Sequence, residues 1–131
     1  MTFVDTSALY PLVAEDDDAH LVATDHFATT AREAGFLTHS YVLVEVVALV
    51  QRRLGMLAVR RLLDVMGPTV TVVPVDTPLH DAGVAALLSA GSRSVSLVDR
   101  VSFELMRRRG ITDAFAFDDD FALAGFRVVP G

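Results

Sequence analysis

The chain has 131 residues, of which 52% are hydrophobic and 21% are charged, and its formal net charge is -6. This length suits one domain, and so large an apolar share can fill a core, which excludes extensive disorder. The lack of cysteine excludes disulfides and thiolate metal sites. The acidic balance argues against a nucleic-acid binder held by bulk electrostatics. With no leader segment and no apolar run that could span a bilayer, we expect a cytoplasmic protein without a membrane segment.

A strand is expected at the N-terminus, because Thr2–Val4 is apolar and β-prone. Asp5 follows it directly, and Thr6 and Ser7 are typical of helix starts, so a helix is expected over 7–14. A strand that leads into a helix places its last residue at the carboxyl edge of a sheet, where ligands bind in open α/β folds. Asp5 is therefore a candidate site residue, although an Asp here also suits a plain helix cap.

The rest of the chain alternates between helical and strand patterns, with glycines after several of the helices. The β-branched run over 70–75 predicts a buried parallel strand. In chain order, the remaining expected elements are a helix over 20–34, a strand over 36–38, helices over 41–54 and 57–66, a strand over 70–75, helices over 78–88 and 96–109, and strands over 114–117 and 126–129. This alternation predicts a three-layer α/β/α sandwich with a central, mostly parallel sheet, in one domain over 1–131.

The helix expected over 41–54, with Ser40 as its N-cap, is apolar almost all round, so we expect it to be buried. Glu45 lies in its middle, and an ionised carboxylate there is costly unless a cation or donors compensate it. We therefore interpret Glu45 as a candidate functional residue. The alternatives are a partly exposed side chain or an ion pair with Arg52.

Two further acidic positions lie near element ends in the C-terminal part of the chain. Asp99 belongs to the pattern Ser96-x-x-Asp99, which is also a variant of the capping box. Asp118 follows the last buried strand and precedes Asp119 and Asp120. A loop or a helix cap explains one of these carboxylates, but three in a row beyond an apolar strand need a cation or extensive hydration.

The four candidate acids, Asp5, Glu45, Asp99 and Asp118, are expected to meet at one edge of the sheet, because right-handed crossovers bring such positions together. Clustered carboxylates raise each other's pKa values, and they stay ionised together when a hard divalent cation lies among them. Oxygen ligands without His or Cys suit Mg²⁺ or Mn²⁺ and not Zn²⁺. Since the sequence has no nucleophile motif and no phosphate-binding glycine loop, we expect the metal to activate water for in-line attack on a phosphate.

All the basic residues are arginine, and seven of them fall in three clusters: Arg52–Arg53, Arg60–Arg61 and Arg107–Arg109. The guanidinium group matches phosphate geometry, so these clusters are candidate nucleic-acid contacts. Solvated helix faces and favourable interactions with helix dipoles explain them equally well.

At four places the chain resembles the PIN domain: Asp5-Thr6-Ser7-Ala8-Leu9, Glu45 in an apolar helix, Ser96-Leu97-Val98-Asp99-Arg100-Val101-Ser102-Phe103, and Phe117-Asp118-Asp119-Asp120-Phe121. The resemblance covers essentially the whole chain, and the compact size resembles the VapC-type toxins of bacterial toxin–antitoxin pairs. It implies a Mg²⁺- or Mn²⁺-dependent endoribonuclease that cleaves RNA.

The resemblance also assigns roles to individual residues. It implies that Asp5 and Asp99 are the principal metal ligands, that Glu45 is the third acid, and that Asp118 is the fourth acid, which positions metal-bound water. The family often has Thr or Ser where this chain has Ala116, so Asp119 and Asp120 remain alternatives to Asp118.

The partners that the resemblance implies are an RNA substrate, a second copy in a homodimer, and a small VapB-like antitoxin whose basic segment would enter the acidic site. Transfer, ribosomal and messenger RNA all remain open as substrates. One alternative is a PIN nuclease of RNA maturation without an antitoxin. Another is a non-catalytic Mg²⁺-binding module of the receiver kind, which the lack of lysine disfavours.

Overall fold

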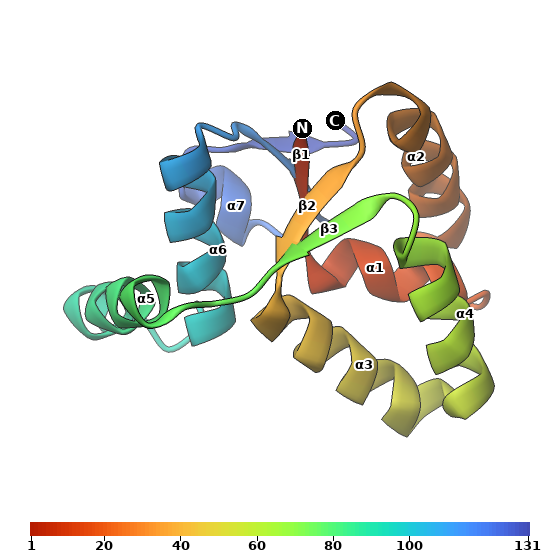
Figure 1. Cartoon of the computed structure of the whole chain (residues 1–131), viewed down its shortest axis with the longest axis horizontal. Coiled ribbons are helices and arrows are strands. Elements are labelled where there is room, and N and C mark those ends of the chain that lie inside the picture. Colours follow the sequence, from red (N-terminus) through yellow and green to blue (C-terminus); the bar gives the residue numbers. More distant parts are fainter.

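The computed structural model describes all 131 residues and contains a five-stranded sheet in the order β3-β2-β1-β4-β5. The strands are β1 (Thr2–Val4), β2 (Phe36–His39), β3 (Val70–Val73), β4 (Asp113–Phe115) and β5 (Arg127–Val129). The helices are α1 (Thr6–Val13), α2 (His20–Glu33), α3 (Ser40–Leu54), α4 (Met56–Met66), α5 (Thr77–Ala90), α6 (Leu97–Arg109) and α7 (Asp120–Leu123). Every strand pair is parallel, and helices cover both faces of the sheet (Figure 1), which confirms the expected α/β/α class.

Helices α1 to α4 lie on one side of the sheet and α5 to α7 on the other (Figure 1). Strand β1 is fully buried at the centre, where Phe3 is in register with Leu37 of β2 and with Ala114 of β4. Because the strands are parallel, β1, β2 and β4 all end at the same edge of the sheet. The residues that follow these three strands are thereby brought together.

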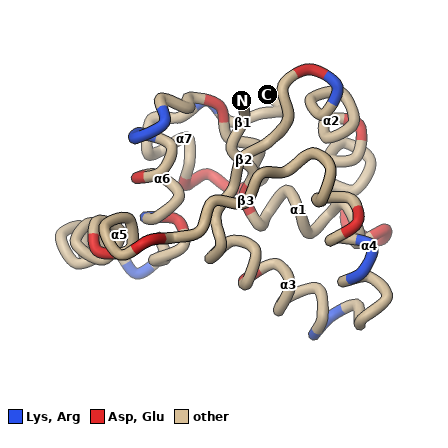
Figure 2. The backbone as a smooth tube through the Cα atoms, viewed as in Figure 1, with Lys and Arg blue, Asp and Glu red and all other residues tan.

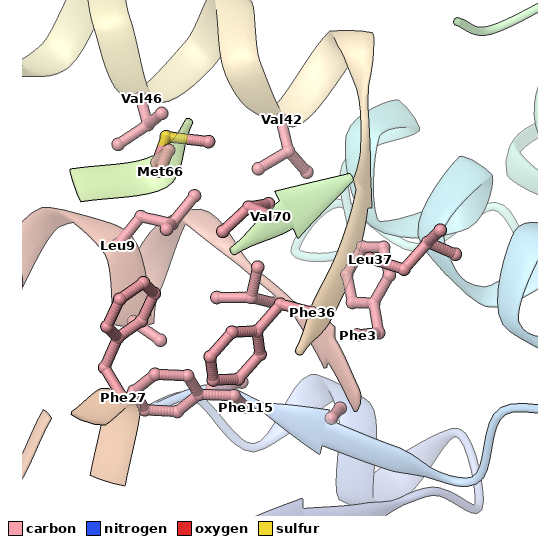
Figure 3. Packing of buried hydrophobic residues seen from close by; sticks show 14 of the residues in the cluster. Phe3, Leu9, Phe27, Phe36, Leu37, Val42, Val46, Met66, Val70 and Phe115 are labelled. Atoms are coloured by element: carbon pink, nitrogen blue, oxygen red, sulfur yellow. The ribbon is translucent and has the colours of Figure 1, made fainter. Parts of the chain in front are cut away.

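The core contains a group of stacked aromatic rings between α2 and the sheet (Figure 3). The rings of Phe27 and Phe36 are stacked with centroids 5.0 Å apart, and Phe36 lies 5.6 Å from Phe115. Burial of each such ring stabilises the fold by about 1.5–3 kcal/mol. These contacts fix β2 and β4 on either side of β1, and so fix the edge at which the three strands end.

Two expectations about buried elements are wrong. Strand β3 lies at the edge of the sheet with Thr71 exposed, so it is not a buried strand. Helix α3 buries only one stripe, and Val44 is 67% exposed. In both elements β-branched residues occupy exposed positions as well as buried ones. A run of apolar residues without alternation therefore does not show which positions are buried. None of the helices is both long enough and apolar enough to cross a bilayer.

Helix α6, which carries Asp99, packs closely against α5 at Gly83. A Cβ at this glycine would lie 2.5 Å from Cγ2 of Val101, so only glycine allows the two helices to approach this far. The close contact fixes the first part of α6 relative to α5.

Candidate functional site

Asp5 is a buried carboxylate directly after β1, and it caps the N-terminus of α1. Its Oδ2 accepts hydrogen bonds from the backbone N–H of Ser7 at 3.1 Å and from Ser7 Oγ at 2.7 Å. Only 3% of the residue is exposed. The pKa of Asp5 is raised to about 7: burial is the largest cause, the hydrogen bonds from Ser7 oppose it, and the charges of Asp118 and Asp99 add to it. The expected cap and the expected site residue are therefore the same side chain.

Ser7 connects this carboxylate to the segment after β4. While its Oγ donates to Asp5, it also accepts a hydrogen bond from the backbone N–H of Phe117 at 3.0 Å. The amide of Phe117 therefore turns toward Ser7, just beyond the end of β4 at Phe115. One hydroxyl group thus sets the position of the loop that carries Asp118.

Asp118 is half-buried beside Asp5. Burial raises its pKa, as does the charge of Asp120, while hydrogen bonds from the backbone of Asp120 and Phe121 and from the Asp5 carboxyl lower it. Its Oδ1 accepts from the N–H of Asp120 at 3.1 Å. Asp119 is exposed and Asp120 is half-buried, but only Asp118 of this acidic run is among the main causes of the raised pKa of Asp5.

Asp99 lies in the first turn of α6 and closes a capping box with Ser96. The N–H of Asp99 donates to Ser96 Oγ at 3.2 Å, and the N–H of Ser96 donates to Asp99 Oδ2 at 3.3 Å. Burial raises the pKa of Asp99, and the charges of Asp118 and Asp120 raise it further. The capping box therefore orients a carboxylate that also belongs to the acidic group.

Asp5, Asp99 and Asp118 thus interact although they come from three separate segments of the chain. The protein supplies no cation to them, because its ion pairs are Glu104 with Arg107 and Asp113 with Arg127. No three acidic or histidine side chains are placed so that together they could hold a metal ion. Mg²⁺, however, is typically held by one or two carboxylates while keeping several waters. A pair of carboxylates with raised pKa values fits such an ion.

The sequence model described as PIN domain matches residues 2–127. The chain belongs to the PIN-domain family. Two curated relatives, from two strains of Mycobacterium tuberculosis, are 35% identical to it over 127 residues, which are 96% of this chain and 95% of each relative. Both carry the name 23S rRNA-specific endonuclease VapC20. The family membership that the motifs predicted is thus confirmed.

Solved structures agree with the PIN-domain assignment. The crystal structure of Mycobacterium tuberculosis VapC20, described as a Sarcin-Ricin loop cleaving toxin, matches with a TM-score of 0.87 at 33% identity, covering 96% of both chains. PAE2754 from Pyrobaculum aerophilum matches with a TM-score of 0.67 at 19% identity, covering 98% of this chain and 88% of that one, and shares the fold.

Glu45 is more exposed than the other three candidate acids of this PIN domain. The expectation that it is buried is wrong, because its side chain lies on the exposed face of α3. It forms no ion pair with Arg52, and it is not among the main causes of the raised pKa values of the three aspartates. Of the four acids singled out in the sequence, Asp5, Asp99 and Asp118 influence one another's pKa values, and Glu45 is not among the main causes of these shifts.

A buried histidine that the sequence did not single out supports the site. His39, not Ser40, caps α3: its Nδ1 accepts from the N–H of Tyr41 at 3.2 Å and of Val42 at 3.4 Å. Its Nε2 donates to Ser102 Oγ in α6 at 2.8 Å. Burial lowers the pKa of His39 to about 4, so the ring is neutral and its tautomer is fixed by these contacts.

The role of Ser40 differs from the expected one. Its Oγ accepts a hydrogen bond from the N–H of Val75 at 2.9 Å, which holds the segment after β3 and not the start of its own helix. When His and Ser stand next to each other before an apolar helix, the sequence does not show which of them is the N-cap.

Two arginines of the cluster over 107–109 have structural contacts at the end of α6 opposite to Asp99 (Figure 2). Arg107 donates to the carbonyl of Ala124, and its guanidinium lies 5.4 Å from the ring centre of Phe126. Arg108 donates to the carbonyl of Pro78. These contacts join α6 to the segments beside it.

Proposed function

We propose that this protein is a divalent-metal-dependent endoribonuclease, a toxin of the VapC kind, and that residues 1–131 act as one PIN-like domain. The observation that carries the proposal is the meeting of Asp5, Asp99 and Asp118 at the carboxyl edge of the sheet with no cation from the protein. The endonuclease relatives, which match over nearly their whole length, support the same activity.

Asp5 and Asp99 are the proposed ligands of Mg²⁺ or Mn²⁺. When bound, such an ion makes water more acidic and stabilises the negative charge that develops on a phosphate. Ser7 holds Asp5 in place and Ser96 orients Asp99. Asp118 is the proposed general base, because a carboxylate whose pKa is raised accepts a proton from the attacking water more readily. We propose a peripheral role for Glu45, because its position on α3 is exposed.

The substrate that we propose is 23S ribosomal RNA, by similarity to the VapC20 relatives. A protein acting on ribosomal RNA works in the cytoplasm, which is where we propose that this one acts. A VapB-like antitoxin that presents basic residues would match the unpaired carboxylates of the site and the net charge of -6. A homodimer is the assembly that we propose by analogy with the family.

A cleavage assay tests the proposed function. The purified protein is incubated with a hairpin of the sarcin–ricin loop sequence and with a scrambled hairpin of equal length, in Mg²⁺, in Mn²⁺ and in EDTA. We expect the wild type to cleave the sarcin–ricin hairpin only when a metal is present. We expect no cleavage by Asp5→Asn or Asp99→Asn. Asp64→Asn, at an exposed position on α4, is the matched control and keeps full activity.

Three outcomes would count against this assignment. Cleavage that persists in EDTA would contradict the metal requirement, and cleavage by Asp5→Asn at the wild-type rate would contradict the site. Cleavage of RNA without growth arrest when the protein is expressed would favour a role in RNA maturation over a toxin.

A further inference from the structure

One Phe or Tyr ring is exposed in the whole molecule, and it belongs to the residue that precedes Asp118. The chain has eight Phe, two Tyr and no Trp. Phe117 is 40% exposed, whereas every other aromatic side chain is buried or half-buried. The exposed large apolar residues elsewhere are aliphatic, as with Leu123, which is 83% exposed on α7. Packing alone therefore does not account for the exposed part of this ring.

The backbone of Phe117 is tied to the site by two consecutive hydrogen bonds. Its N–H donates to Ser7 Oγ at 3.0 Å, and Ser7 Oγ donates to Asp5 Oδ2 at 2.7 Å. The next residue is Asp118, which interacts with Asp5. The ring is thus carried by the same short loop as the proposed general base.

The ring of Phe117 also has a fixed support. It packs in a T-shaped arrangement against the buried ring of Phe115, with centroids 6.0 Å apart and planes at 65°. Support from a rigid core residue restricts the motion of the exposed ring. An aromatic side chain held in this way offers a preformed surface, and a base that stacks on it loses less conformational entropy on binding.

We propose that Phe117 is a stacking platform for an unpaired nucleobase next to the scissile phosphate of the RNA, an inference that rests on the proposed function. Proteins recognise single-stranded RNA by stacking bases on aromatic side chains. The acidic chain has little general attraction for phosphates, and Arg107 and Arg108 are engaged in structural contacts. Stacking on Phe117 would supply affinity that charge does not.

The test compares Phe117→Ala, Phe117→Trp and the control Leu123→Ala in steady-state cleavage of the hairpin. Since one stacked base contributes roughly 5- to 150-fold in affinity, we expect Phe117→Ala to raise KM by about tenfold or more with little change in kcat. Phe117→Trp keeps a stacking surface and is expected to retain a KM near that of the wild type. Leu123→Ala, at a more exposed apolar side chain, is expected to match the wild type.

A substrate change separates stacking from a structural role of the loop. Abasic nucleotides are introduced one at a time beside the cleavage site. We expect one of them to raise KM for the wild type but not for Phe117→Ala, because the contact is already lost in the variant. A lower kcat for both Phe117→Ala and Phe117→Trp, with KM unchanged, would show that the residue only positions Asp118 and would overturn the proposal.

A binding experiment keeps the inference testable if the wild type does not cleave the hairpin, which would refute the proposed function or its substrate. RNA carrying 2-aminopurine beside the expected cleavage site is titrated with protein in Ca²⁺ in place of Mg²⁺. Quenching by the wild type and by Phe117→Trp, but not by Phe117→Ala, supports stacking. Equal quenching by all three, or no quenching by any, overturns it. Wild-type kinetics for Phe117→Ala together with weaker inhibition by the antitoxin would assign the ring to a protein interface and would also overturn it.

Discussion

His39 and Ser102 are 63 residues apart in the sequence, yet Nε2 of the histidine donates to Oγ of the serine at 2.8 Å in the interior of the protein. Ser102 in turn donates to the carbonyl of Val98, at 2.9 Å, in the first turn of α6. The end of β2 is therefore fixed to the helix turn that carries Asp99. The position of a proposed metal ligand depends on a neutral histidine that contacts no substrate.

Replacement of Ser102 by alanine is expected to destabilise the protein by roughly 1–2 kcal/mol, because the buried N–H of His39 loses an acceptor. The free energy of unfolding in urea measures this effect. Ser89→Ala, at an exposed position of α5, is the control and should change the free energy by no more than about 0.5 kcal/mol, in the stabilising direction. We also expect weaker Mn²⁺ binding in calorimetry for Ser102→Ala. A variant with wild-type stability and Mn²⁺ affinity would refute the role of this contact.

The neutral state of His39 predicts acid sensitivity. Its pKa is lowered from 6.5 to about 4 by burial, against a weaker opposing hydrogen bond to Val98. The unfolded chain therefore binds more protons between these pH values, so the stabilisation is present above pH 6.5 and is lost as the pH falls through about 4. The shift corresponds to at most about 3 kcal/mol. Urea unfolding at pH 7, 5 and 4 should show a steeper loss for the wild type than for His39→Gln; parallel curves would contradict the prediction.

Asp5 predicts the opposite dependence in the metal-free protein. Its pKa is raised to about 7 by burial, so the folded state binds more protons than the unfolded chain at intermediate pH. The contribution of Asp5 to the free energy of unfolding is therefore fully present below pH 4 and is lost as the pH rises through about 7. This contribution is of the order of 4 kcal/mol at most. Asp5→Asn should abolish this part of the pH dependence of the free energy of unfolding.

Addition of Mg²⁺ or Mn²⁺ should reverse the loss at pH 7.5, because a ligand that binds only the folded state stabilises it. Thermal unfolding with and without metal, for the wild type and Asp5→Asn, measures the effect. A metal-induced rise in melting temperature of the same size in Asp5→Asn would place the ion elsewhere.

Glu45→Gln should lower kcat/KM by less than about tenfold, whereas Asp5→Asn and Asp99→Asn should remove detectable cleavage. The reason is position: Glu45 is exposed on α3, while the aspartates share one group with raised pKa values. Single-turnover cleavage rates make the comparison. A loss for Glu45→Gln as large as that for Asp5→Asn would show that Glu45 belongs to the active site despite its exposure.

The parts of the site that are visible in the sequence are those set by local rules. Asp5 and Asp118 follow apolar strands, and Asp99 stands at a fixed spacing from Ser96, so each position follows from neighbouring residues. The parallel topology then brings the strand ends together, and no longer-range information is needed. The same reasoning predicted the α/β/α class, because helix and strand patterns alternate along the chain.

The errors concern properties that depend on distant parts of the chain. Glu45 was expected to be buried because its neighbours are apolar, but only the stripe of Val42, Val46 and Val50 faces the sheet. The contact of His39 with Ser102 joins two elements that no local pattern connects. Helix α7 has only four residues, too few for a helical period to be visible.

The pairing of β1 with β4 has a consequence for the order in which the protein becomes active during synthesis. Strand β1 leaves the ribosome first, but its neighbour at Val4 is Phe115, near the other end of the chain. Until that late segment has emerged and docked, Asp5 has no Asp118 beside it. We therefore expect that fragments that end before β4, which lack Asp118, do not cleave RNA.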